Sequence, residues 1–205
     1  MITKYKGEHK LSRQNGGTGS FAYVVVELSS RKRGSGNLFE SHVNESIIPK
    51  KFIASIENGI NSALSHGTLI GAPIVDVKID LIGGGFHEVD SNPESFKEAG
   101  KKAFIDAYSK APKSVLEPII DLEVEAANEY ISPLLSDLNR RRGKIQEVDF
   151  NKIKAKVPLS ETIGYATDLR SLTKGSGSSC GSPCGYEEID EEILNGTMLP
   201  RGVIK

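Results

Sequence analysis

The sequence predicts an α+β fold in two domains, the first over residues 1–112 and the second over 113–190, followed by a tail over 191–205. Segments with strand-like patterns alternate with segments of helical spacing, which favours a mixed α+β architecture. The sequence Ala-Pro-Lys at 111–113 separates two such sets of elements and is the predicted boundary. A chain of 205 residues is long enough for two small domains.

The first predicted domain has the element order β-β-α-β-α. Residues 22–28 and 38–43 are short apolar stretches rich in strand-forming residues, so both are predicted strands. The segment 49–66 repeats apolar residues at helical spacing, begins with proline and is followed by glycine, as helices often are. Apolar and charged residues alternate over 73–82, which indicates a half-buried strand. A second helix is predicted over 93–111.

The second predicted domain has the element order β-α-β-β-α. Residues 115–126 form a predicted strand, and 128–143 form an amphipathic helix that ends at a glycine. Two strands, 144–150 and 152–159, are joined by a tight turn, and 160–175 is a further helix. One more strand would complete the β-α-β-β-α-β order of a ferredoxin-like sheet.

The segment that should supply this last strand has an unfavourable composition. Residues 175–190, GSGSSCGSPCGYEEID, are rich in glycine, serine and proline, so we expect a loose edge or a linker-like segment. Cys180 and Cys184 lie in it, and two ligands are fewer than the four that a structural metal site uses. Two cysteines in the chain also indicate a reducing compartment. The tail has helical potential near its start but no assigned role.

Charge and hydropathy limit the possible partners. The formal net charge is −1, so a polyanion would have to contact local basic patches, such as Arg31–Arg33 or Arg140–Arg142. Three consecutive arginines at the end of a helix also complement its dipole, so both a structural and a phosphate-binding role stay open. No apolar run approaches the roughly 20 residues of a membrane span, and the N-terminus has no signal-peptide pattern. We expect a soluble protein without a membrane partner.

Two glycine-rich segments are the main candidates for a functional site. The stretch GGGFHEVDS, residues 83–91, places His87, Glu88 and Asp90 within four positions. These residue types fit a metal site, an acid–base pair or a tip that touches a partner, and the sequence pattern leaves all three open. The other segment, RQNGGTGSFAYV at 13–24, is either an ordinary hairpin or a loop whose backbone approaches another surface closely.

Common enzyme motifs are absent from the sequence. There is no G-x-x-x-x-G-K-[ST] phosphate loop and no G-x-S-x-G nucleophile elbow. His87-Glu88 begins an H-E-x-x-H pattern, but Ser91 occupies the position of the second histidine. Glu117 and Glu123 share one face of a predicted strand, where we expect solvated carboxylates rather than acid–base catalysis. We therefore predict no catalytic residues, no metal and no cofactor.

The ordered motifs resemble the elongation factor G family of translational GTPases. SRQNGGTGSFAYV, IIPKKFIASIENGI and GTLIGAPIVDVKIDLIGGGFHEVDSNPESFKEAGKKAF are similar to its domain IV, and SVLEPIIDLEVEAANEYISPLLSDLNRRRGKI and VPLSETIGYATDLRSLTKGSG are similar to its domain V. The resemblance covers residues Glu8 to Gly177. Ribosome-protection proteins of the tetracycline-resistance type share this architecture. The resemblance implies an elongated domain IV-like module over 1–112 and a ferredoxin-like domain V-like module over 113–190.

The resemblance also implies a partner and a set of contact residues. In that family the tip of domain IV enters the decoding region of the ribosome beside the transfer RNA–messenger RNA duplex during translocation, and the tip histidine falls on His87. The other tip loop falls on 14–22, where Ser20-Phe21-Ala22 departs from the usual family pattern. The implied RNA-contacting tip residues are Gln14, Asn15, Gly16, Gly17, Thr18, Gly19, Ser20, His87, Glu88 and Asp90, with Arg140, Arg141 and Arg142 as basic candidates. Asn92 or Ser91 is the predicted cap of the helix that follows, and Asp90 is a further candidate.

The expected function is thus that of a ribosome-binding fragment of an elongation factor G-type GTPase. The GTP-binding domain of the family has no counterpart in this sequence, so we expect no GTP hydrolysis by the chain itself. Alternatives are a stand-alone ribosome- or factor-binding protein, or a fragment of a ribosome-protection protein. A monomer in the bacterial cytoplasm, or in an organellar matrix or stroma, is expected.

Overall fold

A computed structural model describes residues 3–15, 18–67 and 71–189 of the chain. They form two compact units that divide between Pro112 and Lys113, which we call unit 1 and unit 2 in chain order. The tail predicted at 191–205 lies outside the described residues. Within the described ranges, no helix is both long and apolar enough to cross a lipid bilayer.

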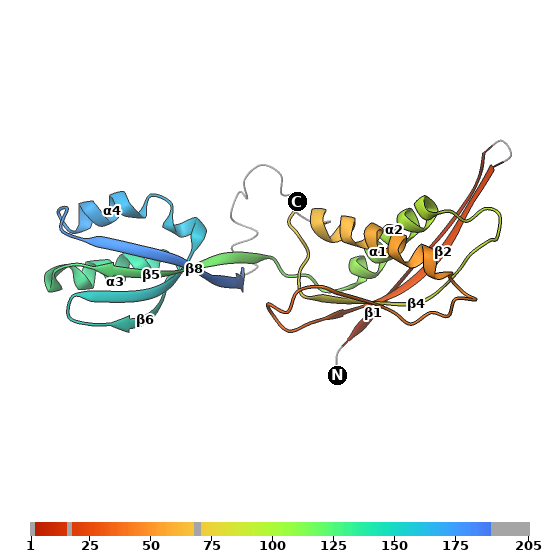
Figure 1. Ribbon diagram of the computed structural model, residues 1–205. Helices are drawn as coiled ribbons and strands as arrows, with labels where there is room; N and C mark the ends of the chain where they lie inside the picture. The colour runs from red at the N-terminus through yellow and green to blue at the C-terminus, as the bar shows by residue number, and fades with distance from the viewer. Residues whose placement is uncertain (1–2, 16–17, 68–70, 190–205) are drawn as a thin grey trace. The chain divides into compact units, whose positions relative to one another are not determined.

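Unit 1 is a four-stranded sheet with two helices on one face (Figure 1). Its elements are β1 (Lys4–Asn15), β2 (Thr18–Ser30), β3 (Leu38–Ser41), α1 (Lys50–His66), β4 (Val77–Gly85) and α2 (Pro93–Lys110). The strand order is β1-β2-β4-β3, in which β2 is antiparallel to both neighbours and β3 is parallel to β4. The short β3 is therefore an edge strand.

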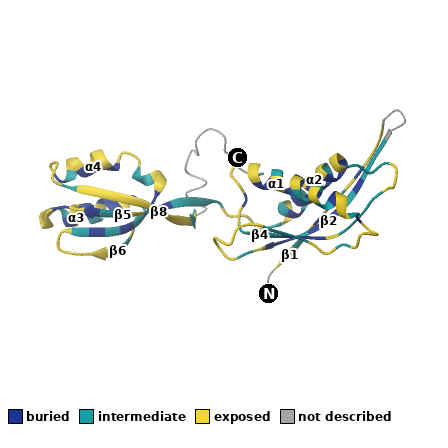
Figure 2. Cartoon of the chain, viewed as in Figure 1, coloured by how far each residue is buried: buried dark blue, intermediate teal, exposed yellow. Residues whose placement is uncertain are grey.

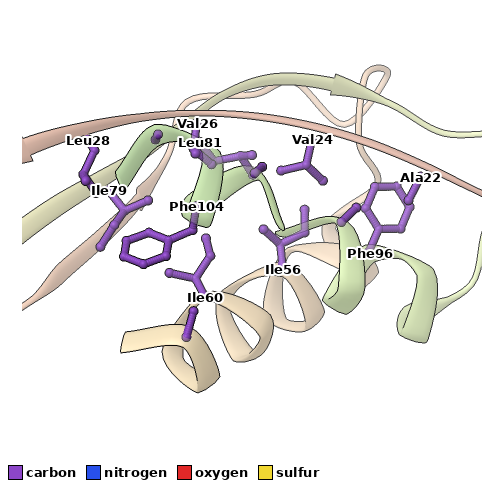
Figure 3. Packing of buried hydrophobic residues seen from close by; sticks show 14 of the residues in the cluster. Ala22, Val24, Val26, Leu28, Ile56, Ile60, Ile79, Leu81, Phe96 and Phe104 are labelled. Carbon is purple, nitrogen blue, oxygen red and sulfur yellow. The ribbon is translucent and has the colours of Figure 1, made fainter. Parts of the chain in front are cut away.

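The hydrophobic core of unit 1 lies between the sheet and the two helices (Figure 3). Alternate residues of the central strands point toward the helices and are buried, namely Ala22, Val24, Val26, Leu28, Ile79 and Leu81. The helices contribute Ile56 and Ile60 from α1 and Phe96 and Phe104 from α2. This alternation leaves the polar residues of the same strands on the opposite face, away from the helices.

The backbones of α1 and α2 come close together at two glycines. A Cβ atom at Gly59 would lie 2.1 Å from the carbonyl oxygen of Lys97, and one at Gly100 would lie 2.9 Å from that of Ile56. Neither position has room for a side chain, because real Cβ contacts are longer than these distances. The rings of Phe52 and Phe96 stack beside this contact, with centroids 4.6 Å apart.

The first strand of unit 1 was missing from the prediction. The sequence predicts a first strand at 22–28, but β1 precedes it and β2 begins earlier, at Thr18. Most of β1 is exposed, and Leu11 is its only described apolar residue that is fully buried. The strand is held by continuous pairing with β2 rather than by an apolar pattern of its own. The segment 13–24 is consequently a hairpin that joins two long strands.

Unit 2 is a second four-stranded sheet with the order β6-β7-β5-β8 and antiparallel neighbours throughout (Figure 1). Its elements are β5 (Leu116–Glu125), η1 (Asn128–Tyr130), α3 (Ile131–Arg140), β6 (Lys144–Val148), β7 (Lys152–Pro158), η2 (Leu159–Thr162), α4 (Tyr165–Leu172) and β8 (Ser178–Glu188). The predicted ferredoxin-like β-α-β-β-α-β order is confirmed. The helix predicted over 160–175 is divided at Gly164, which has a φ of 78°.

The expectation of a loose edge at 175–190 is wrong. Residues of β8 pair along the whole of β5 and complete the sheet, although nearly all of them are exposed (Figure 2). An edge strand needs donors on one side only, so proline is tolerated there. The register shifts beside Pro183, and Gly185 adopts a φ of 141° at this irregularity. Cys180 and Cys184 are exposed free thiols on the strand, not parts of a flexible segment.

Candidate nucleic-acid interface

The two glycine-rich segments come together at one end of unit 1, which we call the tip and define as residues 14–21 and 86–91. The β1–β2 hairpin closes where Asn15 pairs with Thr18. Of these two residues the structure describes only the backbone, and Gly16 and Gly17 lie outside the described residues. Gln14 is exposed and Ser20 is half-buried.

Two hydrogen bonds hold the segment 86–91 against β2, and two more close a turn within the segment. The amide of Phe21 donates to the carbonyl of Asp90 at 2.8 Å. The hydroxyl of Ser91 donates to the carbonyl of Phe21 at 2.8 Å and accepts from the amide of His87 at the same distance. The amide of Ser91 donates to the carbonyl of His87 at 3.1 Å, which closes the turn. The tip therefore has a fixed backbone on which side chains are presented.

His87 is exposed at the tip and is oriented by Asp90. Its side chain is 57% exposed, and its Nδ1 atom lies 3.2 Å from Asp90 Oδ2 and 3.3 Å from the Asp90 amide nitrogen. A neutral imidazole can accept the amide proton at Nδ1, and a protonated one can donate to the carboxylate. Nε2 has no hydrogen-bond partner among the described residues, and in the neutral ring it carries the proton and can act as a donor when Nδ1 accepts.

Gly19 allows the hairpin to approach the Asp90 carboxylate. A Cβ atom at Gly19 would lie 2.3 Å from Asp90 Oδ1, which leaves no room for a side chain. The role of Asp90 as a helix cap is not observed. Asn92 is the cap of α2, and its Oδ1 accepts from the Ser95 amide at 2.8 Å. Asp90 instead contacts both parts of the tip, since its carbonyl accepts from the Phe21 amide and its carboxylate lies beside the His87 ring.

Two basic side chains of β1 lie beside the tip. Arg13 forms two hydrogen bonds with Glu98, at 2.9 and 3.3 Å. Lys10 Nζ lies 5.7 Å from the centroid of the Phe21 ring. Arg13 begins the glycine-rich segment that the sequence indicates, whereas Lys10 lies earlier in β1, a strand that the sequence pattern does not reveal, so Lys10 could not be assigned to the tip beforehand.

The three consecutive arginines of unit 2 have different environments. Arg140 is 74% exposed and pairs with Asp137. Arg141 is only 8% exposed. Its guanidinium donates to Asp137 at 2.8 Å, to the Glu161 carbonyl at 2.6 Å and to Asp168, and it lies over the Tyr165 ring.

Arg142 is likewise committed to contacts within unit 2. Its terminal nitrogens lie 2.7 and 3.0 Å from the two carboxylate oxygens of Glu117, and its Nε lies 3.1 Å from Glu161. Glu117 is therefore a partly buried ion-pair partner and not the solvated carboxylate that the sequence pattern predicted. Phosphate contact by the cluster remains a prediction, and Arg140 is the member whose charge is exposed.

The basic stretch Arg31–Arg33 lies in a turn that Asp76 organises. The Asp76 carboxylate accepts from the amides of Gly34 at 2.9 Å and Gly36 at 2.8 Å. The pKa of Asp76 lies below its ordinary value. The hydrogen bond from the Gly34 amide is the largest cause of this shift. Arg31 donates to the Ser35 carbonyl at 2.7 Å and is thus part of the turn itself.

Comparison with known proteins identifies relatives of both units. Residues 1–112 match the family model described as elongation factor G, domain IV, and residues 114–197 match that of the elongation factor G C-terminus. Elongation factor G of Aquifex pyrophilus is 42% identical over 192 residues, which are 91% of this chain and 27% of that protein. A crystal structure of a protein from Thermus thermophilus has a TM-score of 0.82 and 34% identity, covering 95% of this chain and 30% of that one. The chain thus spans less than a third of the length of either relative.

Proposed function

We propose that this chain, which belongs to the elongation factor G family and contains that family's domain IV and C-terminal regions, binds the ribosome and presents the tip of unit 1 to RNA in the decoding region. The observation that carries the proposal is the exposed imidazole of His87, which Asp90 and the β1–β2 hairpin hold at the end of the sheet. Ribosomal RNA and the transfer RNA–messenger RNA duplex are the proposed partners, and translocation is the proposed process.

The geometry of the tip suits contact with RNA. An imidazole can hydrogen-bond a phosphate oxygen or a ribose 2′-hydroxyl, and the latter distinguishes RNA from DNA. The close approach of Gly19 to Asp90 packs the hairpin directly against the His87 segment, and a glycine-rich backbone can itself approach an RNA surface closely. The formal net charge of −1 means that such a contact depends on local geometry more than on overall attraction.

The proposal assigns no GTP hydrolysis to these residues. The matched regions correspond to domain IV and the C-terminus of the family, and the GTPase activity belongs to the proposed parent protein. We further propose that the chain acts as a monomer in a compartment that contains ribosomes, the cytoplasm in the first place.

Co-sedimentation with ribosomes over a range of salt concentrations tests this function. We expect the chain to pellet with ribosomes at low salt and to dissociate as salt rises, because phosphate contacts release counterions. His87→Ala should weaken binding by about 1 kcal/mol, the typical value of one hydrogen bond. His66→Ala is the matched control, because His66 is an exposed histidine at the end of α1, outside the tip.

Competition distinguishes a specific site from general attraction to RNA. An excess of intact elongation factor G should displace the chain if both use the same site. Binding that is insensitive to this competitor, or that His87→Ala and His66→Ala reduce equally, would contradict the proposed role of the tip.

A further inference from the structure

Three carboxylates lie in one row across the face of the unit 1 sheet that the helices leave uncovered. Strand pairing places Glu27 opposite Asp80, and Asp80 opposite Glu40. Their neighbours Val26, Ile79 and Leu81 point the other way, into the core. Like charges directly opposite each other destabilise a sheet. Since Glu27 pairs with Lys4 at 2.9 Å, the remaining two carboxylates need a cation between them.

His42 and Lys78 meet these two carboxylates. The amide of His42 donates to the Leu81 carbonyl at 2.9 Å, which extends the pairing of β3 with β4 and sets His42 on the same face as Glu40. His42 Nε2 lies 2.9 Å from Asp80 Oδ1 and 3.6 Å from Glu40 Oε2. Lys78 Nζ bridges the same two oxygens, at 3.0 and 2.7 Å.

The distances from His42 to the two carboxylates are close to those between ligand atoms in the coordination shell of zinc. Ligand atoms about 2.0 Å from a tetrahedral zinc ion are roughly 3.3 Å from one another. The distances of 2.9 and 3.6 Å from His42 Nε2 to the two carboxylate oxygens lie on either side of that value. One ligand atom from each of Glu40, His42 and Asp80 lies within 4.8 Å of the others.

The accessibility of the cluster also fits a metal site that retains a bound water. Asp80 is only 6% exposed, so its carboxylate is fixed, whereas the side chains of His42 and Glu40 are exposed to solvent. Three protein ligands and one solvent ligand is the arrangement of an open zinc site. One imidazole with two carboxylates suits zinc better than magnesium or calcium, which prefer oxygen ligands alone.

We propose that Glu40, His42 and Asp80 bind one divalent transition-metal ion, Zn²⁺ in the first place, in exchange for the ammonium group of Lys78. The long side chain of Lys78 is partly exposed and can swing out to solvent when the metal enters. The bound ion joins the edge strand β3 to β4. Because the ligands come from two strands, the metal binds the folded state in preference to the unfolded chain and stabilises unit 1.

Zinc titration of the full chain by calorimetry tests the proposal. The Cys180→Ser/Cys184→Ser background removes the exposed thiols, because cysteine thiolates are zinc ligands and would compete in the titration. We expect one equivalent to bind and the unfolding midpoint to rise relative to a chelator-treated sample. His42→Ala should lower the zinc affinity at least about tenfold. Loss of a residue that only hydrogen-bonds to a metal ligand already costs about that much, and His42 is proposed as a ligand itself. Lys78→Met should raise the affinity, because it removes the competing cation.

Two controls separate loss of the metal site from loss of the fold or of an unrelated histidine. His66→Ala, which removes an exposed histidine outside the cluster, should bind zinc as the parent does. Circular dichroism of each apo variant shows whether it is folded before metal is added. Absence of saturable binding, unchanged affinity in His42→Ala, or reduced affinity in folded Lys78→Met would each overturn the proposal.

Discussion

Arg142 and Glu117 form a bidentate ion pair in unit 2, with the two terminal guanidinium nitrogens 2.7 and 3.0 Å from the two carboxylate oxygens. Arg142 holds this position with a φ of 58°, in the left-handed region just after α3. The pair joins the end of the helix to the start of β5. Bidentate pairs between arginine and a carboxylate are among the strong hydrogen bonds of proteins.

Glu117→Gln should lower the free energy of unfolding of unit 2 by about 2 kcal/mol, because it leaves a partly buried guanidinium with a weaker partner. Urea unfolding at neutral pH measures the loss. Lys154→Ala is the comparison, since its ion pair with Glu147 at 2.7 Å is exposed and should contribute less than about 1 kcal/mol. Equal losses of unfolding free energy in the two variants would show that the bidentate pair stabilises unit 2 no more than an exposed ion pair does.

Asp137 makes the stability of unit 2 depend on pH. Burial raises the pKa of Asp137, but hydrogen bonds from Arg141 and Arg140 outweigh burial and hold the pKa below its ordinary value. The folded state therefore favours the ionised carboxylate more than the unfolded state does. This contribution is complete above about pH 4 and is lost as the pH falls through the folded pKa.

Asp137→Asn should consequently destabilise unit 2 at pH 7 by about 2 kcal/mol, and the difference from the parent chain should shrink at acid pH. Urea unfolding followed from pH 7 downward checks both statements. A difference between the two proteins that stays constant with pH would mean that the carboxylate charge is not the cause.

The sequence predicts an element well where a pattern of apolar side chains determines it. It predicts an element poorly where backbone hydrogen bonds to a neighbouring strand determine it. The two strands that it does not reveal, β1 and β8, are both edge strands with exposed side chains. Neither has an apolar alternation of its own, and each is held by hydrogen bonds to a buried neighbour, β2 or β5. The helices and inner strands could be predicted because their apolar residues recur with the period of the element.

The same distinction applies to the candidate sites. His87 and Asp90 lie three residues apart, so one turn suffices to bring them together, and sequence spacing alone indicates the pair. Glu40 and Asp80 are forty residues apart and meet only because β3 runs parallel to β4 in one particular register. Arg141 was ambiguous for a further reason, since its partners Asp137 and Asp168 come from two helices whose packing the sequence does not specify.

Gly59→Ala should destabilise unit 1 although alanine is the better helix former. In an exposed helix the change would stabilise by about 1 kcal/mol. At Gly59 the added Cβ would lie 2.1 Å from the Lys97 carbonyl and would force α1 and α2 apart, at a cost of roughly 1–3 kcal/mol. Thermal unfolding of Gly59→Ala and of the exposed α1 variant Asn61→Ala measures the contrast. Stabilisation by Gly59→Ala would show that the helices can separate without loss.

Gly19→Ala should alter the tip while the rest of unit 1 stays folded. The added Cβ would lie 2.3 Å from Asp90 Oδ1, so the carboxylate must move away from His87. We expect changed NMR signals for His87 and a loss of ribosome affinity comparable with that of His87→Ala, with a small change in unfolding free energy because the tip is exposed. Asp90→Ala combined with Gly19→Ala removes the clash and separates its effect from loss of the carboxylate. If Gly19→Ala left both the His87 signals and binding unchanged, the close approach of the hairpin to Asp90 would have no part in positioning the imidazole.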